Sequence, residues 1–195
     1  MSNVQFVFKV TALSVAGFVL VGVGVGQLLA DRWTVATTRV LRAKSDRVMA
    51  AIGDLAGWQD WYAAQVDLGN PTRCEVLGTA GTVGHALRWS GPRGEASLTL
   101  QKVTVGADGA GAIDYDYGTM AANGGPANRG TGRVMFAPSG DGCSVTWIDG
   151  GVWDGLMGRW WGWFGALQDR CKQIQISTLE GLQQHLEPPG PGASK

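Results

Sequence analysis

One histidine, one aspartate and two tyrosines are the side chains of this sequence best suited to proton chemistry. His85 stands in the run TVGHALRWSG, Tyr115 and Tyr117 in AIDYDYG, and Asp149 in CSVTWIDG. An imidazole, or a carboxyl group whose pKa is raised by burial, can exchange a proton with a bound molecule near neutral pH. A plainer role is open for two of them: His85 as a structural hydrogen-bonding group, and Asp149 as a cap of the glycine turn that follows it.

Alternation along these runs predicts that the four residues share one face of a sheet, because successive side chains of a strand point to opposite faces. Asp114 and Asp116 then fall on the solvent face. Aromatic and aliphatic side chains with a few polar groups are the usual lining of a small-molecule site, although nine tryptophans are also enough to fill a core without a cavity. The candidate ligand-binding residues are His85, Leu87, Trp89, Ile113, Tyr115, Tyr117, Val145, Trp147 and Asp149, with Trp163 and Leu167 from a C-terminal helix.

Composition and motifs argue against several classes of function. Sixteen basic and sixteen acidic residues give a net charge of zero, so the chain lacks the positive surface that nucleic-acid binding requires. There is no H-E-x-x-H motif, no G-x-S-x-G motif and no phosphate-binding loop with lysine, and we expect neither a cofactor nor a metal. Cys74 and Cys143 could pair in an oxidising compartment with Cys171 left over, or all three could be separate apolar residues.

The first part of the domain combines one strand with two short helices. A β-branched run predicts a strand over 33–42, and apolar residues at helical spacing predict a helix over 46–55. Ser45 or Asp46 would cap the first amides of that helix. A second short helix is expected over 57–64.

The rest of the domain is predicted to be a sheet followed by a helix. Six short alternating runs separated by glycine turns occupy 72–151, which favours an antiparallel meander, and 121–130 is expected to be a mobile loop. An apolar stripe from Trp160 to Leu186 predicts one amphipathic helix of about 28 residues, with His185 on its surface. The proline- and glycine-rich tail, 188–195, is expected to be disordered.

Residues 10–30 contain no charged side chain and are long enough to cross a bilayer, which takes about 20 residues. We therefore expect an uncleaved single-pass membrane anchor after a short flank, 1–9, with the domain of residues 31–187 on the periplasmic or extracytoplasmic side. The basic residues after the span would by themselves favour the opposite orientation. Gly22 and Gly26 would let two such helices approach as a weak homodimer, although glycine is common in membrane helices without that role.

A strand, two short helices, six antiparallel strands and a long helix make the order of a helix-grip fold of the α+β class, in which a curved sheet of about seven strands wraps the last helix. Four segments in this order resemble the SRPBCC superfamily of START-like proteins and, within it, the bacterial polyketide cyclase/dehydrase-like group. The resemblance covers about residues 35–187. The segments are Arg42 to Asp54 with Trp58-Gln59-Asp60-Trp61, Gly81 to Gly91, Cys143 to Trp147, and Leu179 to Leu182.

The resemblance implies a cavity between sheet and helix that takes an apolar ligand such as a lipid, a sterol or a polyketide-like molecule. Our leading interpretation is a membrane-anchored domain that binds a hydrophobic small molecule without covalent chemistry. Two alternatives stay open. One is a cyclase or dehydratase-type enzyme in which His85, Asp149 and a tyrosine transfer protons; the other is a ligand-free interaction module that contacts the membrane surface through the tryptophan-rich segment 153–164.

Overall fold

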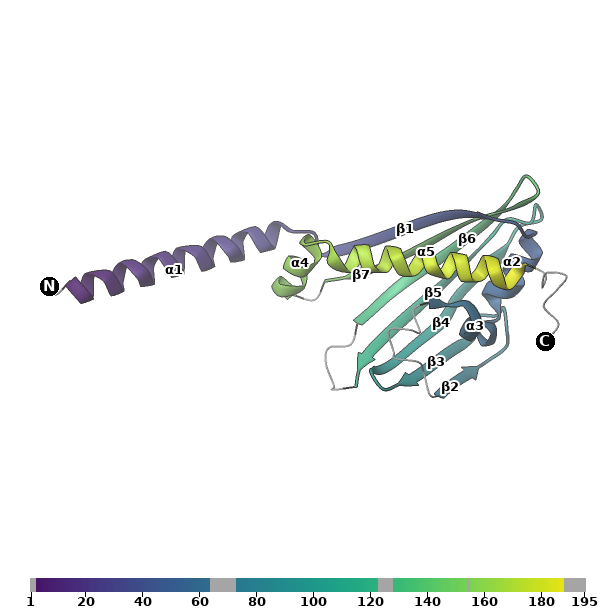
Figure 1. Cartoon of the computed structure of the whole chain (residues 1–195), viewed down its shortest axis with the longest axis horizontal. Helices are drawn as coiled ribbons and strands as arrows, with labels where there is room; N and C mark the ends of the chain where they lie inside the picture. The colour runs from purple at the N-terminus through teal and green to yellow at the C-terminus, as the bar shows by residue number, and fades with distance from the viewer. Residues whose placement is uncertain (1–2, 64–72, 123–127, 154, 188–195) are drawn as a thin grey trace.

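The centre of the protein is a seven-stranded antiparallel sheet (Figure 1). The computed structural model describes residues 3–63, 73–122, 128–153 and 155–187. Strands β2 to β7 each pair with the next along the chain, and β1 closes the order β1-β7-β6-β5-β4-β3-β2, which confirms the predicted meander. The strands are β1 (Arg32–Leu41), β2 (Arg73–Leu77), β3 (Ala86–Gly91), β4 (Gly94–Val105), β5 (Gly111–Ala121), β6 (Asn128–Ser139) and β7 (Gly142–Val152).

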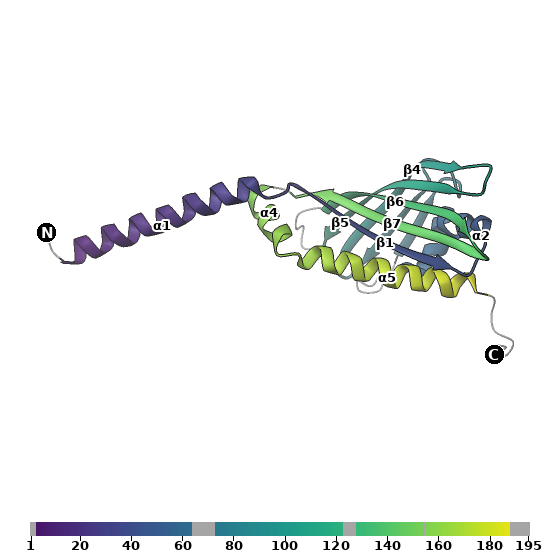
Figure 2. The ribbon, with the colours of Figure 1, turned by 90° about the horizontal axis from the view of Figure 1, so that it is seen from above.

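A long C-terminal helix, α5 (Ala166–Leu186), lies across one face of this sheet (Figures 1 and 2). The chain between β1 and β2 adds α2 (Ser45–Gly53), the 3-10 turn η1 (Leu55–Gly57) and α3 (Trp58–Trp61). Their buried residues, together with Leu179 and Leu182 of α5, join the inner side chains of the sheet in one hydrophobic core. The arrangement confirms the predicted helix-grip fold of the α+β class.

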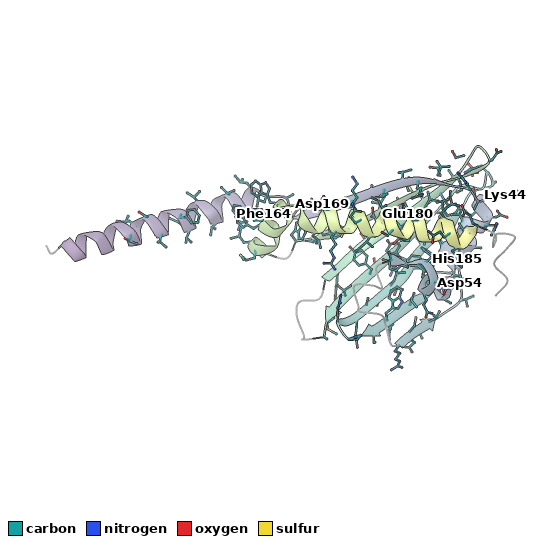
Figure 3. The ribbon with its side chains drawn as sticks, viewed as in Figure 1. Lys44, Asp54, Phe164, Asp169, Glu180 and His185 are labelled. Carbon is teal, nitrogen blue, oxygen red and sulfur yellow. The ribbon has the colours of Figure 1, made fainter. Side chains whose placement is uncertain are left out.

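The C-terminal helical region differs from the single helix that the apolar stripe predicted. It consists of α4 (Gly155–Trp163) and α5, separated at Gly165. Gly165 has a φ of 73°, a left-handed conformation that ends helices and that glycine adopts without steric cost. Its N–H donates to the carbonyl of Gly162 at 3.1 Å, and the neighbouring Phe164 is exposed at the bend (Figure 3).

The N-terminal helix α1 (Asn3–Leu28) extends away from the sheet (Figures 1 and 2). No helix in the described part of the chain is both long and apolar enough to cross a membrane. The prediction of a membrane anchor over 10–30 is therefore wrong, and the extracytoplasmic location derived from that anchor loses its support. The segment does form a helix, which the structure describes up to Leu28.

The end of α1 rests on α4. A Cβ at Gly26 would stand 2.5 Å from Leu156 Cδ1 and 2.7 Å from Trp160 Nε1, whereas a Cβ at Gly22 would meet nothing within 4 Å. Arg159 Nη1 also donates to the carbonyl of Gln27 at 3.2 Å. Gly22 and Gly26 could bring two copies of the helix together only if both were accessible. Gly26 is already buried against α4.

Several local expectations change or fall outside the described residues. Lys44, not Ser45, is the N-cap of α2, and it makes no side-chain cap hydrogen bond. The three cysteines form no disulfide bond in the described structure; Cys74 lies on β2 at one edge of the sheet and Cys143 on β7 near the other, so the interpretation of separate cysteines holds. The loop expected over 121–130 is shorter, because β5 runs to Ala121 and β6 begins at Asn128; its remaining part, 123–127, and the tail at 188–195 lie outside the described residues.

Candidate ligand-binding site

Tyr115 crosses a neighbouring strand to reach β7. On the inner face of the sheet, Tyr115 of β5 pairs with Gly132 of β6, which pairs with Asp149 of β7. A Cβ at Gly132 would stand 2.0 Å from Tyr115 Cζ, so the phenol ring occupies the space above this glycine. The missing side chain on β6 therefore allows the Tyr115 hydroxyl to meet Asp149 two strands away.

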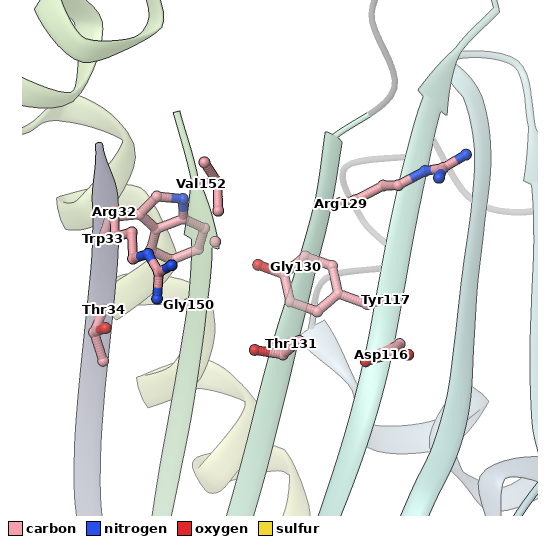
Figure 4. A pocket seen from close by; sticks show the side chains of 11 residues that line it. Arg32, Trp33, Thr34, Asp116, Tyr117, Arg129, Gly130, Thr131, Gly150 and Val152 are labelled. Carbon is pink, nitrogen blue, oxygen red and sulfur yellow. The ribbon is translucent and has the colours of Figure 1, made fainter. Parts of the chain in front are cut away.

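The adjacent row, toward the end of the sheet next to α4, repeats this arrangement. A Cβ at Gly130 would stand 2.4 Å from Tyr117 Cζ, and one at Gly151 would stand 2.8 Å from Trp33 Nε1. Figure 4 shows the Tyr117 ring over Gly130 and the Trp33 ring to its left. A pocket of about 590 Å³ lies at this row, and most of its lining residues, Asp116 among them, belong to the outer face of the sheet. Its lining residues are Arg32, Trp33, Thr34, Asp116, Tyr117, Arg129, Gly130, Thr131, Gly150, Gly151 and Val152.

A continuous chain of hydrogen bonds joins the sheet to α5 in the row beside this pocket. Tyr115 Oη donates to Asp149 Oδ1 at 2.5 Å, and Trp147 Nε1 donates to Tyr115 Oη at 2.7 Å. Gln175 of α5 donates through Nε2 to Asp149 Oδ2 at 2.8 Å and to the carbonyl of Val35 at 3.2 Å. Thr37 Oγ1 donates to Gln175 Oε1 at 2.7 Å. We call Thr37, Tyr115, Asp149 and Gln175 the polar cluster.

The pKa values of Asp149, Tyr115 and Tyr117 are all raised, chiefly because these groups are buried. Burial raises the pKa of Asp149, and hydrogen bonds from Gln175, Tyr115 and Trp147 offset part of that rise. Burial also raises the pKa of Tyr115 well above its usual value, with a further contribution from the charge of Asp149. The pKa of Tyr117 is raised first by burial and then by charge at Asp149 and Cys171, which places all three side chains near one another. A half-buried carboxyl group of raised pKa is typical of functional sites.

The other half of the inner face is filled by rings. Tyr62 stacks between Trp89 and Trp147, with centroid distances of 5.8 and 6.0 Å, and Trp58 lies 5.4 Å from Trp147 and 5.0 Å from Trp61. Trp58 is fully buried and Trp147 is 1% exposed. We call these five residues, Trp58, Trp61, Tyr62, Trp89 and Trp147, the aromatic cluster. In this half, the alternative of a filled core describes the structure better than a cavity does.

The predicted ligand-binding residues therefore separate into three groups. Six of them, Leu87, Trp89, Ile113, Tyr115, Val145 and Trp147, are core residues with at most 4% exposure, whereas Tyr117, Asp149 and Leu167 are half-buried toward the α4 end. Trp163 is 64% exposed and contacts Trp160 and Phe164 instead of the sheet.

His85 lies apart from this site under η1. Its Nε2 accepts from the backbone N–H of Leu55 at 3.1 Å, and its Nδ1 meets the carbonyl of Leu77 at 3.0 Å. Nδ1 therefore carries the proton and donates it to the carbonyl. Both ring nitrogens are used by the backbone, which corresponds to the plainer, structural role considered for this residue.

Sequence reasoning missed the partners that orient Asp149. Gln175 stands four residues after Cys171 and three before Thr178 on the inward face of α5, and it is only 2% exposed. A glutamine at that spacing in an apolar stripe was the available signal. Tyr62, Trp58 and Trp61 were recognised only as part of a short helix. Within the described ranges, no group of three His, Cys, Asp or Glu side chains is placed to hold a metal ion.

Comparison with solved structures places the fold among known proteins. A protein of Chromobacterium violaceum is 20% identical over 80% of this chain and 99% of its own, with a TM-score of 0.55. Ginseng major latex-like protein 151 from Panax ginseng is 11% identical over 82% and 100%, at 0.53, and the Aha1 dimer of Colwellia psychrerythraea is 13% identical over 82% and 99%, at 0.51. No curated protein matches the chain. The family described as polyketide cyclase / dehydrase and lipid transport matches residues 32–187, and the chain belongs to this family.

Proposed function

We propose that this protein binds an apolar small molecule on the inner face of the sheet at its α4 end, with the polar group of the ligand at Asp149. The observation that carries the proposal is the half-buried Asp149 carboxyl group, fixed by Gln175 and Tyr115. In a purely structural core, an apolar side chain could take the place of such a group at little cost in stability. Membership of a family described by cyclase, dehydrase and lipid-transport activities supports the same class of ligand.

The surroundings of Asp149 support a small-molecule site of mixed character. Tyr117 and Cys171 are half-buried near it, and Leu167 is half-buried one turn earlier on α5, whereas the aromatic cluster is closed. On β6 the inward positions at this end are glycines, which removes side-chain volume from the inner face. An apolar surface with a few convergent polar groups is what small ligands usually occupy.

Native mass spectrometry of the full chain, followed by organic extraction, tests the proposal. Cys171→Trp would add an indole beside Tyr117 and should empty the site, whereas Lys172→Trp adds the same group at an exposed position of α5. We expect the wild type and Lys172→Trp to carry the same extractable apolar compound, and Cys171→Trp to carry none. Equal loading of both variants, or an empty wild type that alcohols and lipids also fail to stabilise, would contradict the proposal.

Proton-transfer catalysis is the second candidate, and the raised pKa of Asp149 is the observation that favours it. His85 is a poor participant because both of its ring nitrogens bind backbone groups. An extract that contains two compounds related by loss of water would point to a dehydratase. In that case Asp149→Asn should stop the conversion of one compound to the other.

A further inference from the structure

Every hydrogen atom of the polar cluster already has an acceptor within the protein. The Nε2 group of Gln175 has two hydrogens, and they go to the carbonyl of Val35 and to Asp149 Oδ2. The hydroxyl of Thr37 donates to Gln175 Oε1, and the hydroxyl of Tyr115 donates to Asp149 Oδ1.

The orientation of these groups is forced by their partners. A backbone carbonyl and a carboxylate both only accept, so the Gln175 atom that meets them must be the nitrogen. The indole N–H of Trp147 only donates, so the Tyr115 oxygen must accept from it and turn its own hydrogen to Asp149. No alternative rotation of these side chains releases a donor.

The hydrogen-bonding capacity that the polar cluster does not use within the protein belongs to an acceptor, Asp149. An ionised carboxylate offers about four acceptor sites, and the hydrogen bonds that reach Asp149 come from Tyr115 and Gln175. At least one lone pair of Asp149 is left. Asp149 is half-buried, whereas Tyr115 and Gln175 are 1% and 2% exposed, so within the cluster the group best placed to meet a ligand is an acceptor.

We infer that the ligand presents a hydrogen-bond donor, an O–H or N–H group on an apolar body, to Asp149, and that this carboxylate discriminates against molecules whose polar group only accepts. The inference rests on the proposed function and names its substrate class: alcohols, phenols or amines in preference to ketones, esters and ethers. A ketone at this position would set its oxygen against the carboxylate oxygen and leave both groups unpaired, which is costly in a partly buried site.

The hydroxyl of Tyr117 adds a second polar contact for the ligand and keeps the preference for ligands with a hydrogen-bond donor. Tyr117 is half-buried in the row next to Asp149, and its phenol can donate to a ligand oxygen. An alcohol can accept from Tyr117 while it donates to Asp149, whereas a ketone can make only the first of these bonds.

Isothermal titration of the full wild-type chain with 1-octanol, 2-octanone and octylamine tests the inference, because the three probes share chain length and differ in the polar group. We expect 1-octanol to bind about tenfold more tightly than 2-octanone, the effect of one unpaired buried polar group. Octylamine distinguishes the source of the donor: tighter binding than 1-octanol indicates an ammonium ligand, and weaker binding indicates a hydroxyl ligand. Equal affinity for 1-octanol and 2-octanone would overturn the inference.

Asp149→Asn gives an independent readout, because the amide introduces a donor where the wild type has only acceptors. The ratio of 1-octanol to 2-octanone affinity should fall toward one in this variant, whereas Tyr117→Phe should weaken both probes and keep the alcohol ahead. Should Asp149→Asn fail to fold, the wild-type ratio still decides. Failure of all three probes to bind would count against the proposed function, whereas binding without discrimination would leave that function standing and remove only the donor requirement.

Discussion

The aromatic cluster and the polar cluster lie side by side on one face of one sheet, but they are built in opposite ways. In the aromatic cluster, rings pack on one another, and the indole N–H groups of Trp61 and Trp89 have no hydrogen-bond partner among the described atoms. In the polar cluster, each hydrogen has a defined acceptor. The first region is organised by buried area and tolerates unpaired polar atoms; the second is organised by hydrogen-bond direction and leaves one half-buried carboxylate.

Strand β6 carries the change from one region to the other. Its inward positions are Gly130 and Gly132 at the α4 end, followed by Val134 and Phe136, which are 0% and 2% exposed. Where β6 has side chains, they fill the core; where it has glycine, tyrosine rings from β5 lie across the strand. The boundary between the filled core and the glycine-lined end of the inner face is thus set by a few residues on one strand.

Removing a ring from the aromatic cluster should give the largest effect on stability. Trp58 is fully buried, contacts four other rings, and donates from Nε1 to the carbonyl of Ile52 at 3.0 Å. Trp58→Ala should lower the free energy of unfolding by about 3–5 kcal/mol, measured by urea denaturation. Trp163→Ala is the matched control, since its 64% exposed ring should change stability by less than about 0.5 kcal/mol. Similar losses in the two variants would mean that the described cluster is not the core.

Adding one methyl group to β6 should break the polar cluster with a smaller loss. At Gly132→Ala the new Cβ cannot coexist with the Tyr115 ring, and overpacking of this kind costs about 1–3 kcal/mol. Gly57→Ala is the control, because a Cβ there meets nothing within 4 Å and its φ of −72° suits alanine. Thermal unfolding measures both. If Gly132→Ala were as stable as the control, Tyr115 could not cross β6 as described.

The strand residues of both regions could be predicted from sequence, whereas their contacts, and the part that Trp58, Trp61 and Tyr62 take in the aromatic cluster, could not. Strand parity correctly put Leu87, Trp89 and Trp147 on the inner face, because a two-residue period needs no knowledge of neighbouring strands. The contact of Tyr115 with Asp149 depends on the pairing of β5, β6 and β7 and on Gly132 lying between them, which no local pattern contains. The break at Gly165 was missed for a related reason: the apolar stripe continues through it, and one left-handed glycine ends a helix without altering the stripe.

Two aspartates on opposite faces of the sheet should titrate with opposite effects on stability. Burial raises the pKa of Asp149, so the folded state binds its proton more tightly than the unfolded chain does. Its contribution is therefore fully present below the unfolded pKa and is lost as the pH rises through the folded pKa. Arg133 lowers the pKa of Asp114, so the contribution of Asp114 is present above its unfolded pKa and is lost as the pH falls.

Stability curves of Asp149→Asn and Asp114→Asn from acid to neutral pH measure these two contributions. Relative to the wild type, Asp149→Asn should gain stability as the pH rises, and Asp114→Asn should gain it as the pH falls. The donor preference of the ligand site should follow Asp149, because a protonated carboxyl group can itself donate to a ketone. Slopes of the same sign in the two variants would contradict the contrast between a buried and a solvent-facing carboxyl group.

The smallest expected effect concerns the two polar links between β1 and α5. Arg39 Nη1 lies 2.9 Å from Glu180 Oε1, with the side chains 41% and 50% exposed, whereas Thr37 bonds to the buried Gln175. A double-mutant cycle with Arg39→Ala and Glu180→Ala should give a coupling of less than about 0.5 kcal/mol, because solvent and salt screen an exposed pair. The matching cycle with Thr37→Val and Gln175→Leu should give a larger coupling, since a single substitution there leaves a buried polar atom unpaired. An exposed pair that coupled more strongly than the buried one would mean that surface charge, and not the polar cluster, fixes α5 on the sheet.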